Sequence, residues 1–118
     1  MFIKKIPFIL PQSRQAESTS PFTAKTQSWH PGDVVVIDQV AVSNNDGNSV
    51  LAHVGVIRDE FAIYYETLSL GKKTQFYCTK SPVVVPSGYR VIIKFEGHAA
   101  GDMYYFNIMG HLEILCKE

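Results

Sequence analysis

The chain lacks an excess of charge of either sign, because eleven basic residues balance eleven acidic ones over 118 residues. Binding to nucleic acid depends on neutralising phosphates with clustered lysine and arginine, so we expect no nucleic-acid partner. The chain also lacks an apolar run of the about 18 residues that a membrane helix needs. Its first apolar run, residues 6–10, contains Pro7 and is too short for a signal peptide. We therefore expect neither a membrane span nor a signal peptide.

Cysteine is scarce. Cys78 and Cys116 lie far apart in the sequence and belong to no CxxC or CxxH pattern. Both fall in strand-like runs, so we interpret them as two buried, reduced thiols that act as small apolar residues. A disulfide between neighbouring strands is the alternative, and it would require an oxidising compartment.

Catalytic and cofactor motifs are also missing. The sequence has no GxSxG nucleophile turn, no complete phosphate-binding glycine loop and no HExxH metal motif. We therefore expect no catalytic residues, no cofactor, no metal and no enzyme activity. Four residues come nearest to a metal site but lack ligand spacing, and we interpret them as polar residues of a solvated face and loop. They are His98, Asp102, His111 and Glu113.

What the sequence does contain is a pattern with a period of two. In Met103–Cys116 every second residue, from Tyr104 onward, is apolar or small, which is typical of a half-buried strand. Fourteen residues would span roughly 45 Å. Gly110 in the middle indicates a bulge, a bend or a close backbone approach. We expect one long strand, or two strands joined at a corner.

Shorter β-rich runs precede this stretch, and turns separate them. No segment has the three-and-four spacing of a helix. Seven or eight strands at this spacing predict an all-β fold, a single jelly-roll-like β-sandwich, in which consecutive strands alternate between two sheets. The runs cover residues 34–42, 50–57, 61–70, 74–78, 83–88 and 89–96.

The first 28 residues differ from the rest, since an apolar hook is followed by a polar, proline-containing stretch. We predict that residues 1–28 form an extended N-terminal arm and that residues 29–118 form the sandwich domain. An apolar hook gains stability only when it is buried, so we expect it to contact a neighbouring subunit. The alternative is that residues 2–10 form an edge strand of their own sheet. The interface residues of the hook are Phe2, Ile3, Ile6, Phe8, Ile9 and Leu10.

All six tyrosines fall in predicted strands, so some rings must point away from the core. Tyrosine offers a large rigid surface at low entropic cost, which suits a protein interface or stacking on a sugar. The simpler alternative is that the rings cap the core with their hydroxyls in water. The candidate ligand or partner surface comprises Tyr64, Tyr65 and Tyr105.

Three segments carry a resemblance to a known group of proteins. The stretch 83–93 contains a Pro-Ser-Gly turn, 101–106 begins with Gly-Asp, and 110–114 reads Gly-x-Leu. Together they look like the closing strands of small jelly-roll virion proteins of phages and viruses. The trimeric heads of the C1q/TNF-like group have a similar finish.

The resemblance implies a structural subunit of a homo-oligomer, most concretely a bacteriophage or viral virion protein of the capsid, decoration, vertex or tail. Its partners would be copies of itself and other virion proteins, and it would be assembled in the host cytoplasm. The alternative is a carbohydrate-binding β-sandwich module that uses surface tyrosines. A third hypothesis is a small metal-dependent enzyme on a cupin-like barrel.

Overall fold

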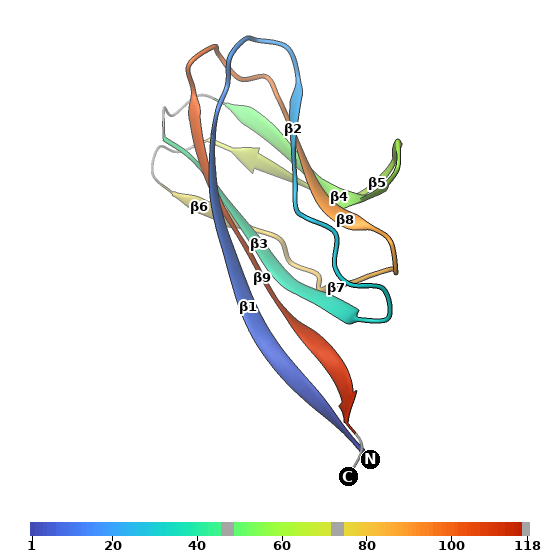
Figure 1. Cartoon of the computed structure of the whole chain (residues 1–118). Helices are drawn as coiled ribbons and strands as arrows, with labels where there is room; N and C mark the ends of the chain where they lie inside the picture. The colour runs from blue at the N-terminus through green and yellow to red at the C-terminus, as the bar shows by residue number, and fades with distance from the viewer. Residues whose placement is uncertain (46–48, 72–74, 117–118) are drawn as a thin grey trace.

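The computed structural model describes residues 1–45, 49–71 and 75–116, and every regular element in these ranges is a β-strand (Figure 1). All the strand pairs are antiparallel. The strands are β1 (Phe2–Gln15), β2 (Phe22–Lys25), β3 (Val34–Asn44), β4 (Val50–Arg58), β5 (Phe61–Leu70), β6 (Phe76–Cys78), β7 (Val83–Val85), β8 (Arg90–Glu96) and β9 (Met103–Cys116).

The strands form two sheets packed face to face. Sheet A has the order β1-β9-β3-β6, with β7 also paired to β3, and sheet B has the order β2-β8-β4-β5. Along the sequence the chain passes from one sheet to the other after β1, β2, β3, β5, β7 and β8, which is the connectivity of a jelly roll. The predicted β-sandwich is confirmed.

The predicted strands agree closely with the observed ones in the second half of the chain. The run 61–70 is β5 without change, and the run 74–78 contains β6, although Thr74 lies outside the described residues. Met103–Cys116 is one unbroken strand, so the alternative of two strands joined at a corner is wrong.

Residues 1–28, predicted to be an arm, supply two strands of the sandwich. β1 pairs with β9 along all 14 of its residues, and β2 pairs with β8. The alternative in which residues 2–10 form an edge strand of their own sheet is therefore confirmed, and the strand extends to Gln15. Contact of this segment with a neighbouring subunit stays a prediction.

The core lies between the sheets and is built by the alternating residues of the strands. Its largest members are aromatic: Phe95 of β8 lies against Tyr104 of β9, with ring centroids 4.7 Å apart. Phe22 of β2 stacks on Phe95 at 4.9 Å. Burying one such ring contributes about 2–3 kcal/mol, so β2, β8 and β9 are fixed to one another across the two sheets.

The two thiols are free, as predicted, but their burial is not as expected. Cys78 is exposed and Cys116 is half-buried. Cys78 belongs to the short strand β6, which pairs with β3 on one side only, and Cys116 is the last residue of β9. The expectation that both thiols are buried apolar groups is therefore wrong.

Gly110 of β9 lies between Phe8 of β1 and Ile37 of β3, its partners in the two strand pairs. A Cβ atom at this position would lie 2.2 Å from the carbonyl oxygen of Val36 and 2.9 Å from Cζ of Phe8. The register between β3 and β9 shifts between Ile37 and Gln39, so Asp38 is the extra residue of a β-bulge beside Gly110. The glycine is therefore required by a close backbone approach, one of the alternatives that the sequence left open.

Replacing Gly110 with alanine is expected to lower the free energy of unfolding by about 2–3 kcal/mol, because backbone atoms must move to admit the methyl group. Gly71→Ala is the control, since a Cβ there would lie 3.8 Å from the Tyr77 hydroxyl and clash with nothing. Both changes remove the same glycine freedom from the unfolded chain. Urea unfolding of both variants measures the difference, and equal midpoints would contradict this role of Gly110.

Candidate interaction surfaces

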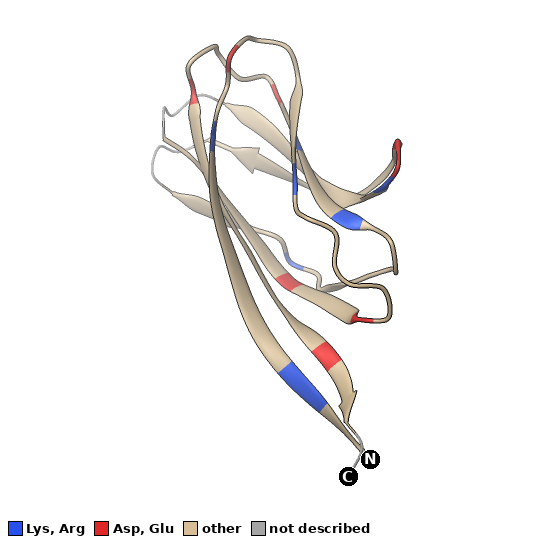
Figure 2. Ribbon diagram, in the orientation of Figure 1, with Lys and Arg blue, Asp and Glu red and all other residues tan. Residues whose placement is uncertain are grey.

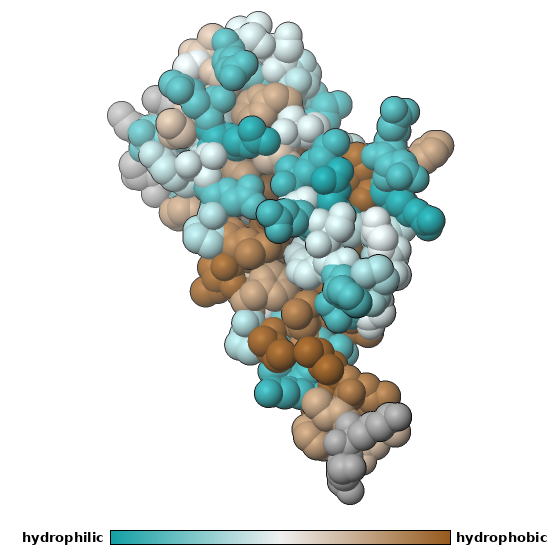
Figure 3. All heavy atoms as spheres, in the orientation of Figure 1, coloured by the Kyte–Doolittle hydropathy of each residue, from teal (hydrophilic) through white to brown (hydrophobic). Residues whose placement is uncertain are grey.

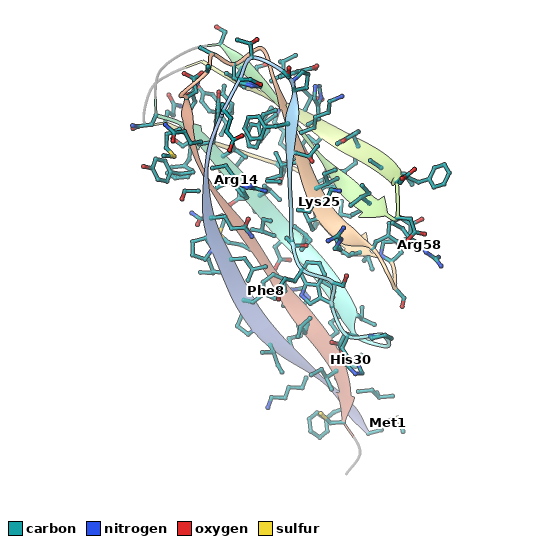
Figure 4. All side chains as sticks on the ribbon, turned by 45° about the horizontal axis from the view of Figure 1, so that its top comes forward. Met1, Phe8, Arg14, Lys25, His30 and Arg58 are labelled. Atoms are coloured by element: carbon teal, nitrogen blue, oxygen red, sulfur yellow. The ribbon has the colours of Figure 1, made fainter. Side chains whose placement is uncertain are left out.

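β1 and β9 extend beyond the rest of the sandwich as a two-stranded ribbon, and Phe2 lies opposite Cys116 at its tip (Figure 1). β3 begins at Val34, which pairs with Glu113, so the last three residues of β9 pair with β1 alone. In Figure 4, Met1 marks the free end of this ribbon and Phe8 lies where the ribbon meets the sandwich. The ribbon tip, residues 2–4 and 114–116, therefore lacks a covering layer from the described strands of sheet B.

Apolar side chains lie on both faces of the ribbon tip. Even-numbered residues of β1 point to the side of the core, and odd-numbered residues point outward, because side chains alternate along a strand. Phe2 is 53% exposed on the first face, and Ile3 is 62% exposed on the second. Leu115, the cross-strand neighbour of Ile3, is exposed as well. The tip therefore presents apolar surface to water on two sides.

The predicted hook is divided between the core and the surface. Phe8 and Leu10 pack against the core of their own chain, and the Phe8 ring lies 5.9 Å from the Trp29 ring. The remaining members are exposed and have no place in the core: Phe2, Ile3, Ile6 and Ile9. The structure thus brings two of the six predicted interface residues into the sandwich and leaves four on the surface.

The free edge of β1 is unsuited to receive another strand. Pro7 and Pro11 have no N–H, so both must occupy the positions that do not hydrogen-bond to β9. Their backbone positions then face the open edge, where an added strand would meet two missing donors. Prolines on an edge strand are a common means of preventing edge-to-edge pairing. A partner that approaches sheet A at β1 must therefore contact its face rather than this edge.

The outer face of sheet A, the side turned away from sheet B, is rich in exposed aliphatic residues. We define this face by Ile9 of β1, Val34 and Val36 of β3, Val84 of β7 and Met109 of β9. Ile9, Val34 and Val84 are exposed, whereas Val36 and Met109 are half-buried. Apolar side chains gather over β1 and β9 in the lower, tapering half of the molecule in Figure 3.

A histidine between two carboxylates lies in the middle of this outer face. Nδ1 of His111 lies 3.0 Å from Oδ2 of Asp38, and Nε2 lies 3.3 Å from Oε1 of Glu113. The hydrogen bond to Asp38, followed by that to Glu113, raises the pKa of His111 above its usual value. The imidazole is only 17% exposed. Sequence reasoning missed Asp38, because only the bulge in β3 brings it to this histidine.

The three candidate tyrosines do not share one surface. Tyr105 is exposed on the outer face of sheet A, whereas Tyr64 is exposed on sheet B, with its ring 6.0 Å from that of His53. Tyr65 is the extra residue where the register of β4 and β5 shifts, and it packs against the core. Burial, together with the charge of Glu66, raises the pKa of Tyr65 to about 12.

Several polar side chains lie near Tyr64 on the outer face of sheet B. Nδ1 of His53 lies 2.8 Å from the hydroxyl oxygen of Thr67, and Nε2 hydrogen-bonds to Glu96. The hydrogen bond from His53 lowers the pKa of Glu96, and the nearby Lys94 acts in the same direction. The outer face of sheet B thus offers hydrogen-bonding groups beside one exposed aromatic ring.

The four residues nearest to a metal site belong to two separate structural features. His98 is buried and its Nε2 donates to the carbonyl oxygen of Ser18 at 2.8 Å, while Asp102 accepts from the backbone N–H of Ala99 at 2.9 Å. These two residues fix the loop before β9, whereas His111 and Glu113 lie on the outer face of sheet A. Across residues 1–45, 49–71 and 75–116, no three metal-ligating side chains gather into a candidate site.

Comparison with known proteins adds no family assignment. Neither a protein-family model nor a curated protein matches the chain. In the described ranges, no helix has the length and apolar character needed to cross a membrane. Function must therefore be argued from the surfaces themselves.

The His111 cluster should make the stability of the protein depend on pH. The folded-state pKa of His111 lies above the ordinary value of 6.5, so the folded protein binds this proton more tightly than the unfolded chain. The stabilisation is complete below about pH 6.5 and is lost as the pH rises through the folded-state pKa. Urea midpoints measured from pH 5.5 to 8.5 at one protein concentration should fall over this window.

His111→Gln keeps a hydrogen-bonding side chain but cannot be protonated, so its midpoints should fall less than those of the wild type. The difference between the two curves isolates His111 from the other three histidines. Parallel curves over the whole range would contradict the assignment.

Proposed function

We propose that this chain is a structural subunit that assembles with copies of itself, most concretely as a virion protein of a phage or virus. The observation that carries the proposal is the apolar surface on both faces of the ribbon tip. The resemblance of the closing strands to small jelly-roll virion proteins supports the same function. The proposal includes no catalytic activity; its partners are other copies of the chain and further virion proteins, and assembly takes place in the host cytoplasm.

The energetics of the ribbon tip support a role in assembly. Burying half of a phenylalanine side chain, roughly 100 Å², contributes about 2.5 kcal/mol. Phe2, Ile3 and Leu115 are each more than half exposed, so covering them together would yield several times the thermal energy. A monomer gains nothing from holding these side chains at the end of a projecting ribbon, whereas a neighbouring subunit can bury them.

The charge of the chain also favours association between copies. With eleven basic and eleven acidic residues, two copies carry no net repulsion at neutral pH. A jelly roll with short loops can pack side by side in a ring, shell or tube. The ribbon then acts as a clamp that reaches the neighbouring subunit.

Removing the apolar groups of the tip should abolish assembly through the ribbon. The double variant Phe2→Ser/Ile3→Ser is expected to sediment as a smaller particle than the wild type does under the same conditions. The matched control is Phe61→Ser/Ile63→Ser, which removes the same residue types from exposed positions on the edge strand β5 of sheet B. The control should assemble like the wild type.

Sedimentation velocity and negative-stain microscopy of the full chain at tens of micromolar read out this test. A wild-type protein that stays monomeric would contradict the proposed function. So would a tip variant that assembles as well as the control.

A second candidate function rests on the surroundings of Tyr64. An exposed ring beside hydrogen-bonding side chains is the usual composition of a sugar-binding surface, and His53 and Thr67 supply such groups. In this function the chain is a carbohydrate-binding module that acts through sheet B. The opposite placement of Tyr105 restricts the module to Tyr64 and its neighbours.

A glycan array tests this second function. Tyr64→Ala should reduce any sugar signal at least tenfold, because stacking on the ring is lost. Tyr105→Ala is the control on the other sheet and should leave the signal unchanged. An array without a sugar hit, or equal losses in both variants, would contradict a sugar site at Tyr64.

A further inference from the structure

We propose that the outer face of sheet A is a two-fold interface between two copies of this chain, and that the interface weakens when His111 loses its proton. The inference rests on the proposed function and specifies the surface, the partner and the condition of assembly. It concerns the face of the sheet above the ribbon tip, centred on the cross-strand row Pro7, His111, Val36 and Val84.

The outer face of sheet A has the composition of a protein interface rather than that of a solvent-exposed surface. Ile9, Val34 and Val84 are 65%, 43% and 61% exposed, and they come from three different strands. Half-buried Val36 and Met109 lie among them. Exposed aliphatic residues on β1, β3 and β7 lie on both sides of a polar group formed by Lys5, Glu113, His111 and Asp38.

The area is sufficient for a dimer. Strands about 4.8 Å apart, with a rise of about 3.3 Å per residue, give the face of β1, β9, β3 and β7 above the ribbon tip an area of roughly 570 Å². Two copies would bury roughly 1,100 Å² in total, above the about 1,000 Å² that a specific interface needs. Two sheets can pack in this way face to face at a distance of about 10 Å.

The blocked edge of β1 excludes one geometry of the contact. Pro7 and Pro11 prevent a second copy from extending sheet A through β1, as argued above. A face-to-face contact leaves that edge free and uses the same patch on both copies, as an isologous dimer requires. It closes after two copies, and the ribbon tips remain available for further assembly.

The charges of the face also fit a second copy. The groups that face His111 are Glu113 on its own strand and Asp38 on β3, while Lys5 on β1 pairs in register with Glu113. β7 contributes only valines. In Figure 2 a basic band on β1 lies beside an acidic band on β9, in the lower half of the molecule. With His111 protonated, the positive charges of His111 and Lys5 balance the negative charges of Asp38 and Glu113. The buried cluster is then neutral.

Deprotonation of His111 removes this balance. The cluster of each copy then carries a net negative charge, and a two-fold axis brings both clusters into one interface. Burial of an uncompensated charge is costly, and like charges across an interface repel. Association therefore binds one proton per copy, and the dimer is favoured at a pH below the pKa of His111 in the dimer.

Sedimentation equilibrium of the full chain at pH 6.0 and pH 8.0 tests the inference. The dissociation constant of the wild-type dimer should rise by about 10- to 100-fold between these values, since each of two protons contributes about tenfold per unit of pKa change on association. In His111→Gln the constant should be the same at both values and close to that of the wild type at pH 8.0.

Substitution of the face tests its location. Ile9→Lys and Val84→Lys should each raise the dissociation constant by about 100-fold or more, because each places a charge in an apolar contact. Ile63→Lys is the matched control: Ile63 is 59% exposed and lies on the edge strand β5 of sheet B. It should leave the dimer unchanged, and circular dichroism should show that all the variants fold.

The outcomes separate this inference from the proposed function. If the protein assembles but neither Ile9→Lys nor Val84→Lys weakens its association, the outer face is not the interface. The interface at the ribbon tip is not affected by this result. If these variants weaken the dimer but His111→Gln keeps the pH dependence, the role of His111 is overturned. A wild type that is monomeric at both pH values overturns both proposals.

Discussion

The pairing of the first strand with the last is the interaction on which this structure depends. β1 and β9 join residues that are about a hundred positions apart in sequence, and loop closure over that distance opposes their meeting. The ladder compensates for this cost only because it runs without a break from Phe2 to Gln15. It adds the edge strand to sheet A, places Phe2 opposite Cys116 and extends beyond the sandwich. The apolar ribbon tip follows directly from that extra length.

A second constraint is the close approach at Gly110, which determines what the outer face can do. Without a side chain at this position, β3 and the Phe8 ring lie close against β9. The β3 bulge at the same point adds Asp38 and turns its carboxylate toward His111. One glycine and one inserted residue therefore create both a tight junction of three strands and a charged cluster inside an apolar face. The packing and the electrostatics of this region cannot be altered independently.

The sequence predicts this fold best where a strand has one solvent-exposed face and one buried face. Met103–Cys116 alternates clearly, so the pattern predicts its β-structure throughout, although one long strand and two strands joined at a corner both fit it. β1 was recognised only as an apolar hook with a possible edge strand over residues 2–10, since its second half is polar and carries Pro11. An edge strand tolerates both features. Bulges account for the placement of Asp38 and Tyr65, because at each of them one extra residue reverses the alternation and no local residue pattern predicts it.

The outer faces of the two sheets differ in composition, so the molecule has one polar side and one apolar side. Sheet B presents Lys94, His53 and Glu96, whose charges and hydrogen bonds are compatible with water. Sheet A presents aliphatic residues around a single polar cluster. In a lone sandwich both faces would meet the same solvent, and nothing would favour such an asymmetry. In an assembly the faces have different surroundings, so an apolar sheet A turned toward a copy and a polar sheet B turned toward water satisfy both compositions at once.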